Sequence, residues 1–141
     1  MPPRPPAIMP GLRLRIKTPF GHLHVTVVVD VPVDQEREVF AQIGHAGDLV
    51  AADVEGMCRL ASLYLRSGGK MEDVVRQLKG IGTNLARSDK ELVSVPDSLG
   101  TALKKYMDAK KKHGLKALLT GEAVLEERDE DEKSAVVVPV L

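Results

Sequence analysis

The chain has 141 residues with 20 basic and 20 acidic side chains, so it has no formal net charge when its histidines are neutral. This length predicts a single domain with its own core, and the balanced charge gives no field that favours nucleic acid or a membrane surface. Only 3% of the residues are aromatic, which argues against a platform for base stacking. Its one cysteine, Cys58, excludes an internal disulfide and a cysteine-rich zinc site.

Residues 1–11 contain five of the nine prolines, and we expect them to form an extended arm. This start is too rich in proline and too polar for a signal peptide. No apolar run reaches the roughly 18 residues that a membrane span requires. The sequence therefore predicts a cytoplasmic protein without a membrane partner.

Three short stretches follow the arm with patterns that are typical of β-strands. Residues 13–17 alternate basic and apolar side chains, and residues 22–30 alternate at first and then become continuously apolar. Residues 38–43 form a third stretch. A turn at 18–21 and a loop at 31–37 separate these stretches, and such short links predict an antiparallel meander.

Helical spacing replaces the strand pattern after Gly47. We predict Asp48 as the N-cap of a helix whose apolar residues recur every three or four positions until Ser67-Gly-Gly stops it. A neighbouring apolar stripe predicts that this helix is buried on more than one side. The stripe contains Leu49, Leu60 and Leu63.

Two further helices are predicted downstream. Glu72 and Asp73 favour a helix start, because acidic side chains interact well with the positive end of a helix, and Gly80 ends this helix. After an irregular loop, Ser94-Val-Pro-Asp97 supplies a capping hydroxyl, an early proline and an acid at the third helical position. The apolar face of the last helix contains Leu99, Ala102, Leu103 and Tyr106.

The predicted fold class is α+β, with a small antiparallel three-stranded sheet and two to three helices packed on one face. We expect the domain over 12–108 and a charged tail over 109–141, which ends in an apolar segment. Such a segment can add a strand to a sheet edge, either in this protein or in a neighbour, and so predicts a homo-oligomer or partner contact. The docking residues would be Val136, Val137, Val138, Val140 and Leu141.

One group of side chains is a candidate contact for an anion or a partner. The glycine-containing turn before the first helix could hold an anion or a nucleotide on its backbone N–H groups, although it fits no nucleotide-binding motif and a structural turn is the alternative. Two arginines share a helix face with a glutamate and could contact phosphate, unless Arg59 and Glu55 form a structural salt bridge. The whole group is Gly44, His45, Gly47, Asp48, Glu55, Arg59 and Arg66.

For several other side chains we prefer a structural interpretation over a functional one. His22 and His24 share one face of a strand and could ligate a metal, but solvent-facing histidines are commoner, so we predict neither a metal nor a cofactor. Cys58 stands among apolar neighbours and is predicted in the core. The six lysines at 104–116 could contact an acidic partner, but a solvated helix end is preferred and nucleic acid is not an expected partner.

Several segments resemble one known family in the correct order. Glu55–Gly68 resembles the family's Glu…Arg-Leu-Ile-Ser-Leu…Leu-Arg-Ser-Gly helix, and Gln77–Ile81 resembles its Gln-Leu-Lys-Gly-Ile helix end. Ser94–Asp97 resembles the Ser-Cys-Pro-Asp or Ser-Ile-Pro-Asp element that names the TSCPD domain, and residues 12–29 and 38–44 resemble its strands. The chain thus resembles the C-terminal domain of adenosylcobalamin-dependent ribonucleotide reductases.

The resemblance implies a domain that follows a catalytic barrel and also occurs alone. Many family members have cysteines where this chain has Phe20, Asp48 or Leu49, and Val95, and thiol exchange requires a second sulfur. We therefore expect no catalysis by this chain itself. It would be an accessory or split subunit that supports deoxyribonucleotide synthesis through contacts with a reductase catalytic chain. The alternative is a repurposed structural protein that assembles with itself.

Overall fold

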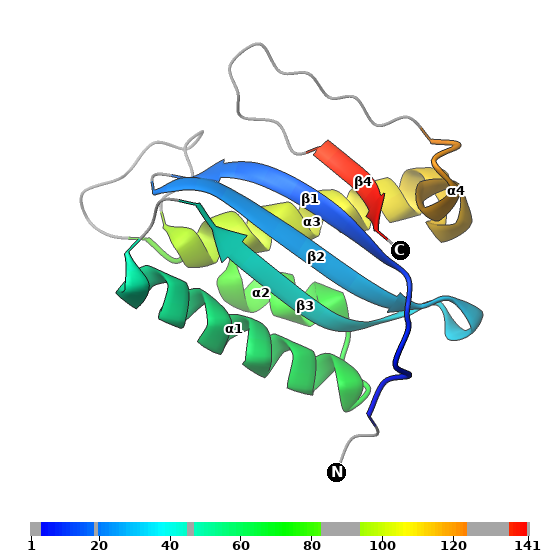
Figure 1. Cartoon of the computed structure of the whole chain (residues 1–141), viewed down its shortest axis with the longest axis horizontal. Helices are drawn as coiled ribbons and strands as arrows, with labels where there is room; N and C mark the ends of the chain where they lie inside the picture. The colour runs from blue at the N-terminus through cyan, green and yellow to red at the C-terminus, as the bar shows by residue number, and fades with distance from the viewer. Residues whose placement is uncertain (1–3, 19, 45–46, 83–93, 124–135, 141) are drawn as a thin grey trace.

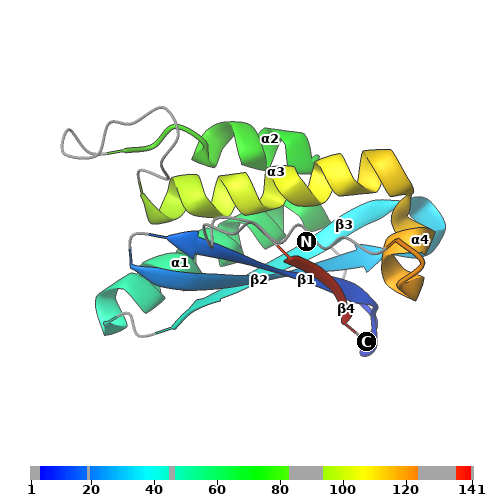
Figure 2. The same cartoon turned by 90° about the horizontal axis from the view of Figure 1, so that it is seen from above.

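The computed structural model describes residues 4–18, 20–44, 47–82, 94–123 and 136–140. The strands and helices are β1 (Gly11–Thr18), β2 (Gly21–Asp30), the 3-10 helix η1 (Val31–Val33), β3 (Gln35–Ile43), α1 (Asp48–Arg66), α2 (Met71–Leu78), α3 (Val95–His113), α4 (Leu115–Thr120) and β4 (Val136–Val140). The four strands form one antiparallel sheet in the order β3-β2-β1-β4. α2 and α3 cover one face of this sheet, and α1 packs beside the outer strand β3 (Figures 1 and 2).

Alternate residues of β1 and β2 point toward the helices and form the core. This period of two is what the sequence pattern predicts for strands with one buried face, and the predicted α+β class is confirmed. α3 contributes the four apolar residues predicted for its buried face, all with no exposed surface. The fully buried side chains include Leu12, Leu14, Ile16, Leu23, Val25, Val27, Val29, Leu99, Leu103 and Tyr106.

The sheet differs from the prediction in two places. β3 begins at Gln35 and not at residue 38, because η1 and the left-handed Asp34 (φ 54°) reverse the chain within a few residues. The tail supplies a fourth strand, since Val136 pairs with Arg15 and Val138 pairs with Arg13. The apolar segment thus adds a strand to the sheet of its own chain. Its docking onto a partner stays a prediction, and Leu141 lies outside the described residues.

Two predictions for α1 are wrong. Gly47 is the N-cap and Asp48 is the first helical residue, although its carboxylate still lies at the positive end of the helix. The helix is not buried on more than one side, because it packs at the edge of the sheet and only one of its sides meets the rest of the chain. The exposed fractions of Leu49, Leu60 and Leu63 are 83%, 71% and 45%.

The capping element before α3 forms as predicted and also ties two helices together. Ser94 Oγ accepts a hydrogen bond from the Asp97 N–H at 3.1 Å. The Asp97 carboxylate accepts another from the Gly80 N–H at 2.8 Å, just beyond the end of α2. Because Asp97 is itself buried, these bonds hold the end of α2 against the start of α3.

A buried carboxylate joins β3 to α3. Glu36 is 7% exposed and accepts hydrogen bonds from Tyr106 Oη and Lys110 Nζ, each at 2.8 Å. Burial and the adjacent Glu36 carboxylate raise the pKa of Tyr106 above its usual range, so the phenol keeps the proton that it donates. Lys110 also pairs with Asp34 at 3.1 Å. The buried charge of Glu36 is therefore compensated by two donors from one helix.

Replacing Glu36 should destabilise the fold more than replacing an exposed acid. Glu36→Ala leaves the Tyr106 hydroxyl and the Lys110 ammonium without their shared acceptor, and we expect a loss of about 3 kcal/mol in the free energy of unfolding. Asp108→Ala, at a side chain of α3 that is 65% exposed, is the matched control and should change this free energy by less than about 0.5 kcal/mol. Urea unfolding followed by circular dichroism measures both. Equal losses would contradict the role assigned to Glu36.

Candidate functional site

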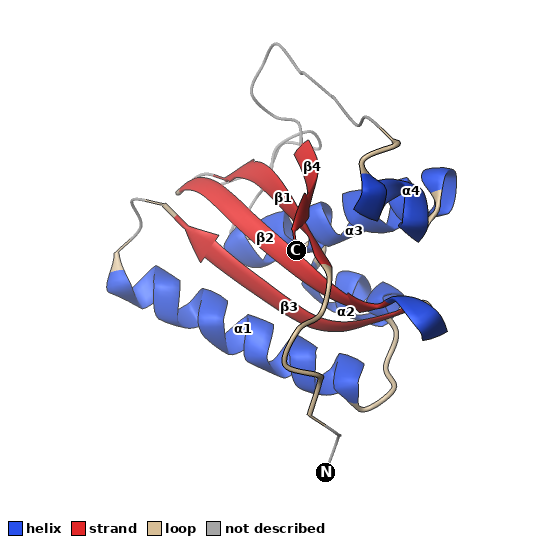
Figure 3. Cartoon of the chain, turned by 45° about the vertical axis from the view of Figure 1, so that its right-hand side comes forward, coloured by secondary structure: helices blue, strands red, loops and turns tan. Residues whose placement is uncertain are grey.

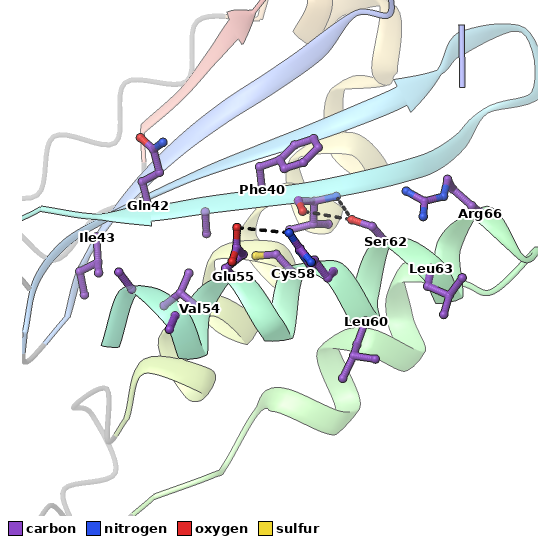
Figure 4. Close-up of a pocket in the computed structure, with 15 residues that line it drawn as sticks. Phe40, Gln42, Ile43, Val54, Glu55, Cys58, Leu60, Ser62, Leu63 and Arg66 are labelled. Atoms are coloured by element: carbon purple, nitrogen blue, oxygen red, sulfur yellow. Dashed lines mark hydrogen bonds and ion pairs between the residues drawn. The ribbon is translucent and has the colours of Figure 1, made fainter. Parts of the chain in front are cut away.

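A groove of about 1060 Å³ lies between β3 and α1 (Figure 4). It exists because β3 is an edge strand, with β2 on one side and a helix in place of another strand on the other. β3 contributes the apolar and amide side chains of residues 39–43, whereas α1 contributes both apolar and charged residues. The lining from α1 includes Val54, Glu55, Cys58, Arg59, Leu60, Ser62, Leu63 and Arg66.

α1 covers part of the unpaired backbone of β3 with two small side chains. Ser62 Oγ accepts a hydrogen bond from the Val39 N–H at 3.0 Å and donates one to the Val39 carbonyl oxygen at 3.1 Å. One turn earlier, the thiol of Cys58 lies within hydrogen-bonding range of the Ala41 backbone. These contacts protect an edge that could otherwise pair with another chain.

Charged residues lie along the outer part of the groove. Arg59 and Glu55 form the predicted salt bridge at 3.7 Å, with 79% and 67% of their side chains exposed. Arg66 reaches across to Glu38 on β3 at 3.4 Å, and both of these side chains are partly buried. The structure therefore brings Glu55, Arg59 and Arg66 to one groove, where Arg66 helps to hold α1 on β3 and Arg59 faces solvent.

The turn before α1 lies apart from these arginines. Gly44 and Gly47 stand at the start of the helix with Asp48, and His45 lies outside the described residues. Arg59 is eleven residues further along, which corresponds to about 16 Å of helix. The described residues that line the groove include none from this turn. The candidates are thus divided between the helix start and the groove.

The segments that form α1, the end of α2 and the cap of α3 are those that suggested a family. The family model of the TSCPD domain matches residues 3–107. The chain belongs to the TSCPD domain family. No curated protein and no solved structure matches the chain. In this TSCPD domain, the Ser94–Asp97 element acts as a cap that fixes two helices, and the glutamate-to-glycine segment forms the helix beside the groove.

The thiol of the TSCPD domain is placed for packing and not for reaction. Cys58 is 4% exposed, and burial raises its pKa to about 11, so the thiol stays protonated near neutral pH. Its predicted place in the core is confirmed. Among the described residues, no group of three or more histidine, cysteine, aspartate or glutamate side chains could hold a metal ion.

The face of the sheet opposite α2 and α3 carries a cluster of cations. Among the described elements, no helix covers this face, which lies toward the viewer in Figure 3. Arg13, Arg15 and Lys17 alternate along β1 with buried residues and are exposed. His24 stands opposite Arg15 on β2, and His22 stands opposite Lys17. We name this surface, with the exposed Phe40 of β3, the open sheet face.

The surroundings of His24 oppose a positive charge on its ring. Burial lowers the pKa of His24 below its usual value of 6.5, and the nearby Arg13, Arg15 and His22 lower it further. Its Nδ1 is buried without a hydrogen-bond partner among the described residues. The same positive field disfavours a bound metal ion. The sequence showed the alternation of basic residues, but it did not show that the histidines of the next strand lie beside them.

The described helices also include none that is long and apolar enough to cross a membrane.

We predict that native Cys58 reacts slowly with iodoacetamide. A pKa of about 11 in place of 9.0 reduces the thiolate fraction near pH 8 by roughly a hundredfold, and burial slows access further. Labelling followed by mass spectrometry should therefore be at least about a hundredfold slower in the native chain than in urea. Comparable rates in the two states would show that the thiol is accessible.

We also predict that stability falls when the pH drops below about 6.5. The pKa of His24 is lower in the folded state than in the unfolded state, so the unfolded chain takes up the proton first and is favoured as the pH falls. His24→Gln should make the urea midpoint fall less between about pH 7.5 and about pH 5. A variant with the same pH dependence as the native chain would contradict this assignment.

Proposed function

We propose that this chain is a non-catalytic accessory module of a cobalamin-dependent ribonucleotide reductase. It would support deoxyribonucleotide synthesis by binding the catalytic chain of that enzyme. The observation that carries the proposal is the match to the TSCPD domain over residues 3–107. The resembling helix, helix end and capping element have distinct places in the fold, which supports a shared architecture and not a chance likeness of short segments.

The side chains support binding more than chemistry. Passing electrons to a reductase by thiol exchange requires a second sulfur to resolve the mixed disulfide. Cys58 is the one cysteine of the chain, and its buried thiol is a poor nucleophile. Ser62 is also buried, and its hydroxyl is engaged with the backbone of Val39. The chain would therefore act through its surface.

The open sheet face is the surface that we assign to the catalytic chain. Arg13, Arg15 and Lys17 are spaced two residues apart, roughly 7 Å, so they present a row of positive charges. Phe40, 52% exposed on β3, adds an apolar contact to this charged surface. A partner surface with exposed carboxylates and an apolar pocket would complement it.

Reconstitution with a reductase catalytic chain that lacks this domain tests the proposal. We expect the two chains to associate in a pull-down assay and the reductase turnover to rise when the module is added. The double charge reversal Arg13→Glu and Arg15→Glu should weaken the association by about tenfold or more, because it opposes the acidic partner surface. Lys116→Glu on α4 is the matched control and should bind like the native chain.

Failure to associate, together with unchanged turnover, would remove the reductase assignment. Association that survives the Arg13 and Arg15 reversals would instead place the contact on another surface of the module.

A further inference from the structure

α1 exposes a row of leucines that the chain itself leaves uncovered. Leu49 and Leu60 are 83% and 71% exposed, and Leu63 is 45% exposed. α1 is the outermost element beside β3 in Figure 1, and Leu60 and Leu63 point away from the sheet in Figure 4. Burying one leucine side chain is worth roughly 2 kcal/mol, so a row of exposed leucines favours a partner surface that covers it.

These residues form one stripe along α1, and the centre of the stripe is a glycine, which has no side chain. Leu49, Gly56 and Leu63 are separated by seven residues each, and Leu60 lies one turn after Gly56. A Cβ added at Gly56 would meet nothing within 4 Å, so packing inside the chain does not require glycine there. Glycine costs a helix interior about 1 kcal/mol relative to alanine, but it lets another helix approach closely.

The stripe is nearly symmetric about its centre. Leu49 and Leu63 lie at equal distances on either side of Gly56 along the helix. When two copies of such a helix pack antiparallel around a two-fold axis, each residue before the centre lies across from a residue after it. Leu49 of one copy would then pack beside Leu63 of the other, and the two Gly56 backbones would meet at the axis.

The charges on one flank of the stripe select the antiparallel direction. Asp48 and Glu55 lie in the first half of α1, and Arg59 and Arg66 lie in the second half, all on the flank toward β3. An antiparallel pair places the acidic half of this flank against the basic half of its copy. A parallel two-fold pair would instead place this flank against the opposite flank of its copy, and the acidic and basic halves would not meet.

We propose that a second copy of this chain docks antiparallel on α1, so that two chains form a symmetric dimer through the leucine stripe. Glu55 of one copy forms a salt bridge with Arg59 of its partner copy, and these salt bridges lie beside the apolar contact. The open sheet face lies outside this contact and stays available in each chain. The dimer is independent of the reductase assignment, since it rests on the exposed face of α1 alone.

Sedimentation velocity on the full chain at micromolar concentration tests the dimer. We expect the native chain to sediment with twice the mass of one chain. The double substitution Leu60→Glu and Leu63→Glu should halve this mass without changing the circular dichroism spectrum, because both side chains are exposed. Val33→Glu, at a 54% exposed apolar residue on η1, is the matched control and should remain dimeric.

Two further variants test the arrangement of the helices. Arg59→Glu should weaken the dimer by about tenfold, because it places like charges across the axis, and the exchange Glu55→Arg with Arg59→Glu should restore it. Gly56→Leu should dissociate the dimer, because its side chain would separate the two helices at the axis while meeting nothing inside its own chain, whereas Lys116→Leu on α4 should leave the dimer intact. A monomeric native chain would overturn the proposal. So would a dimer that survives the two leucine substitutions or that dissociates only when residues 134–141 are removed.

Discussion

The contact between α1 and the edge of β3 determines the outer surface of this protein. Two hydrogen bonds join Ser62 to the backbone of Val39, and Arg66 pairs with Glu38 on the same strand. Because α1 is held at the edge of the sheet, its far side meets solvent, and a groove remains between helix and strand. The same placement leaves the sheet face opposite α2 and α3 without a covering helix. The groove, the leucine stripe and the open sheet face thus all result from the packing of α1 beside β3.

The buried and the exposed polar and apolar residues of the module have different roles. Inside, Glu36 and Asp97 are buried acids whose hydrogen bonds tie β3 to α3 and α2 to α3, and these bonds specify how the elements are joined. The family model of the TSCPD domain matches the part of the chain that contains both acids. On the outside, the cations of β1 and the leucines of α1 are exposed. They are the residues through which a non-catalytic module would act, because the buried thiol of Cys58 offers little chemistry.

The two proposed contact surfaces lie on separate parts of this small domain. The open sheet face is positively charged along β1, whereas the exposed stripe of α1 is apolar with complementary charges on one flank. Self-association through α1 does not cover the open sheet face, so this charged surface would remain available to a different protein. A dimer built through α1 would keep two copies of the open sheet face accessible, so a single assembly could engage two catalytic chains.

Local patterns in the sequence determined the first three strands, the first three helices and the apolar face of α3, because a period of two or of about 3.6 and a capping serine act within a few residues. The resemblance to the TSCPD domain family could also be recognised in the sequence, because it depends on the order of these segments. Tertiary structure alone decided which apolar stripe of α1 is buried, because the pattern of Leu49, Leu60 and Leu63 matches that of a core face, and only its position at a sheet edge exposes it. The pairing of the tail with β1 and the meeting of Glu36 with Tyr106 were equally hidden, because these contacts join residues that are far apart along the chain.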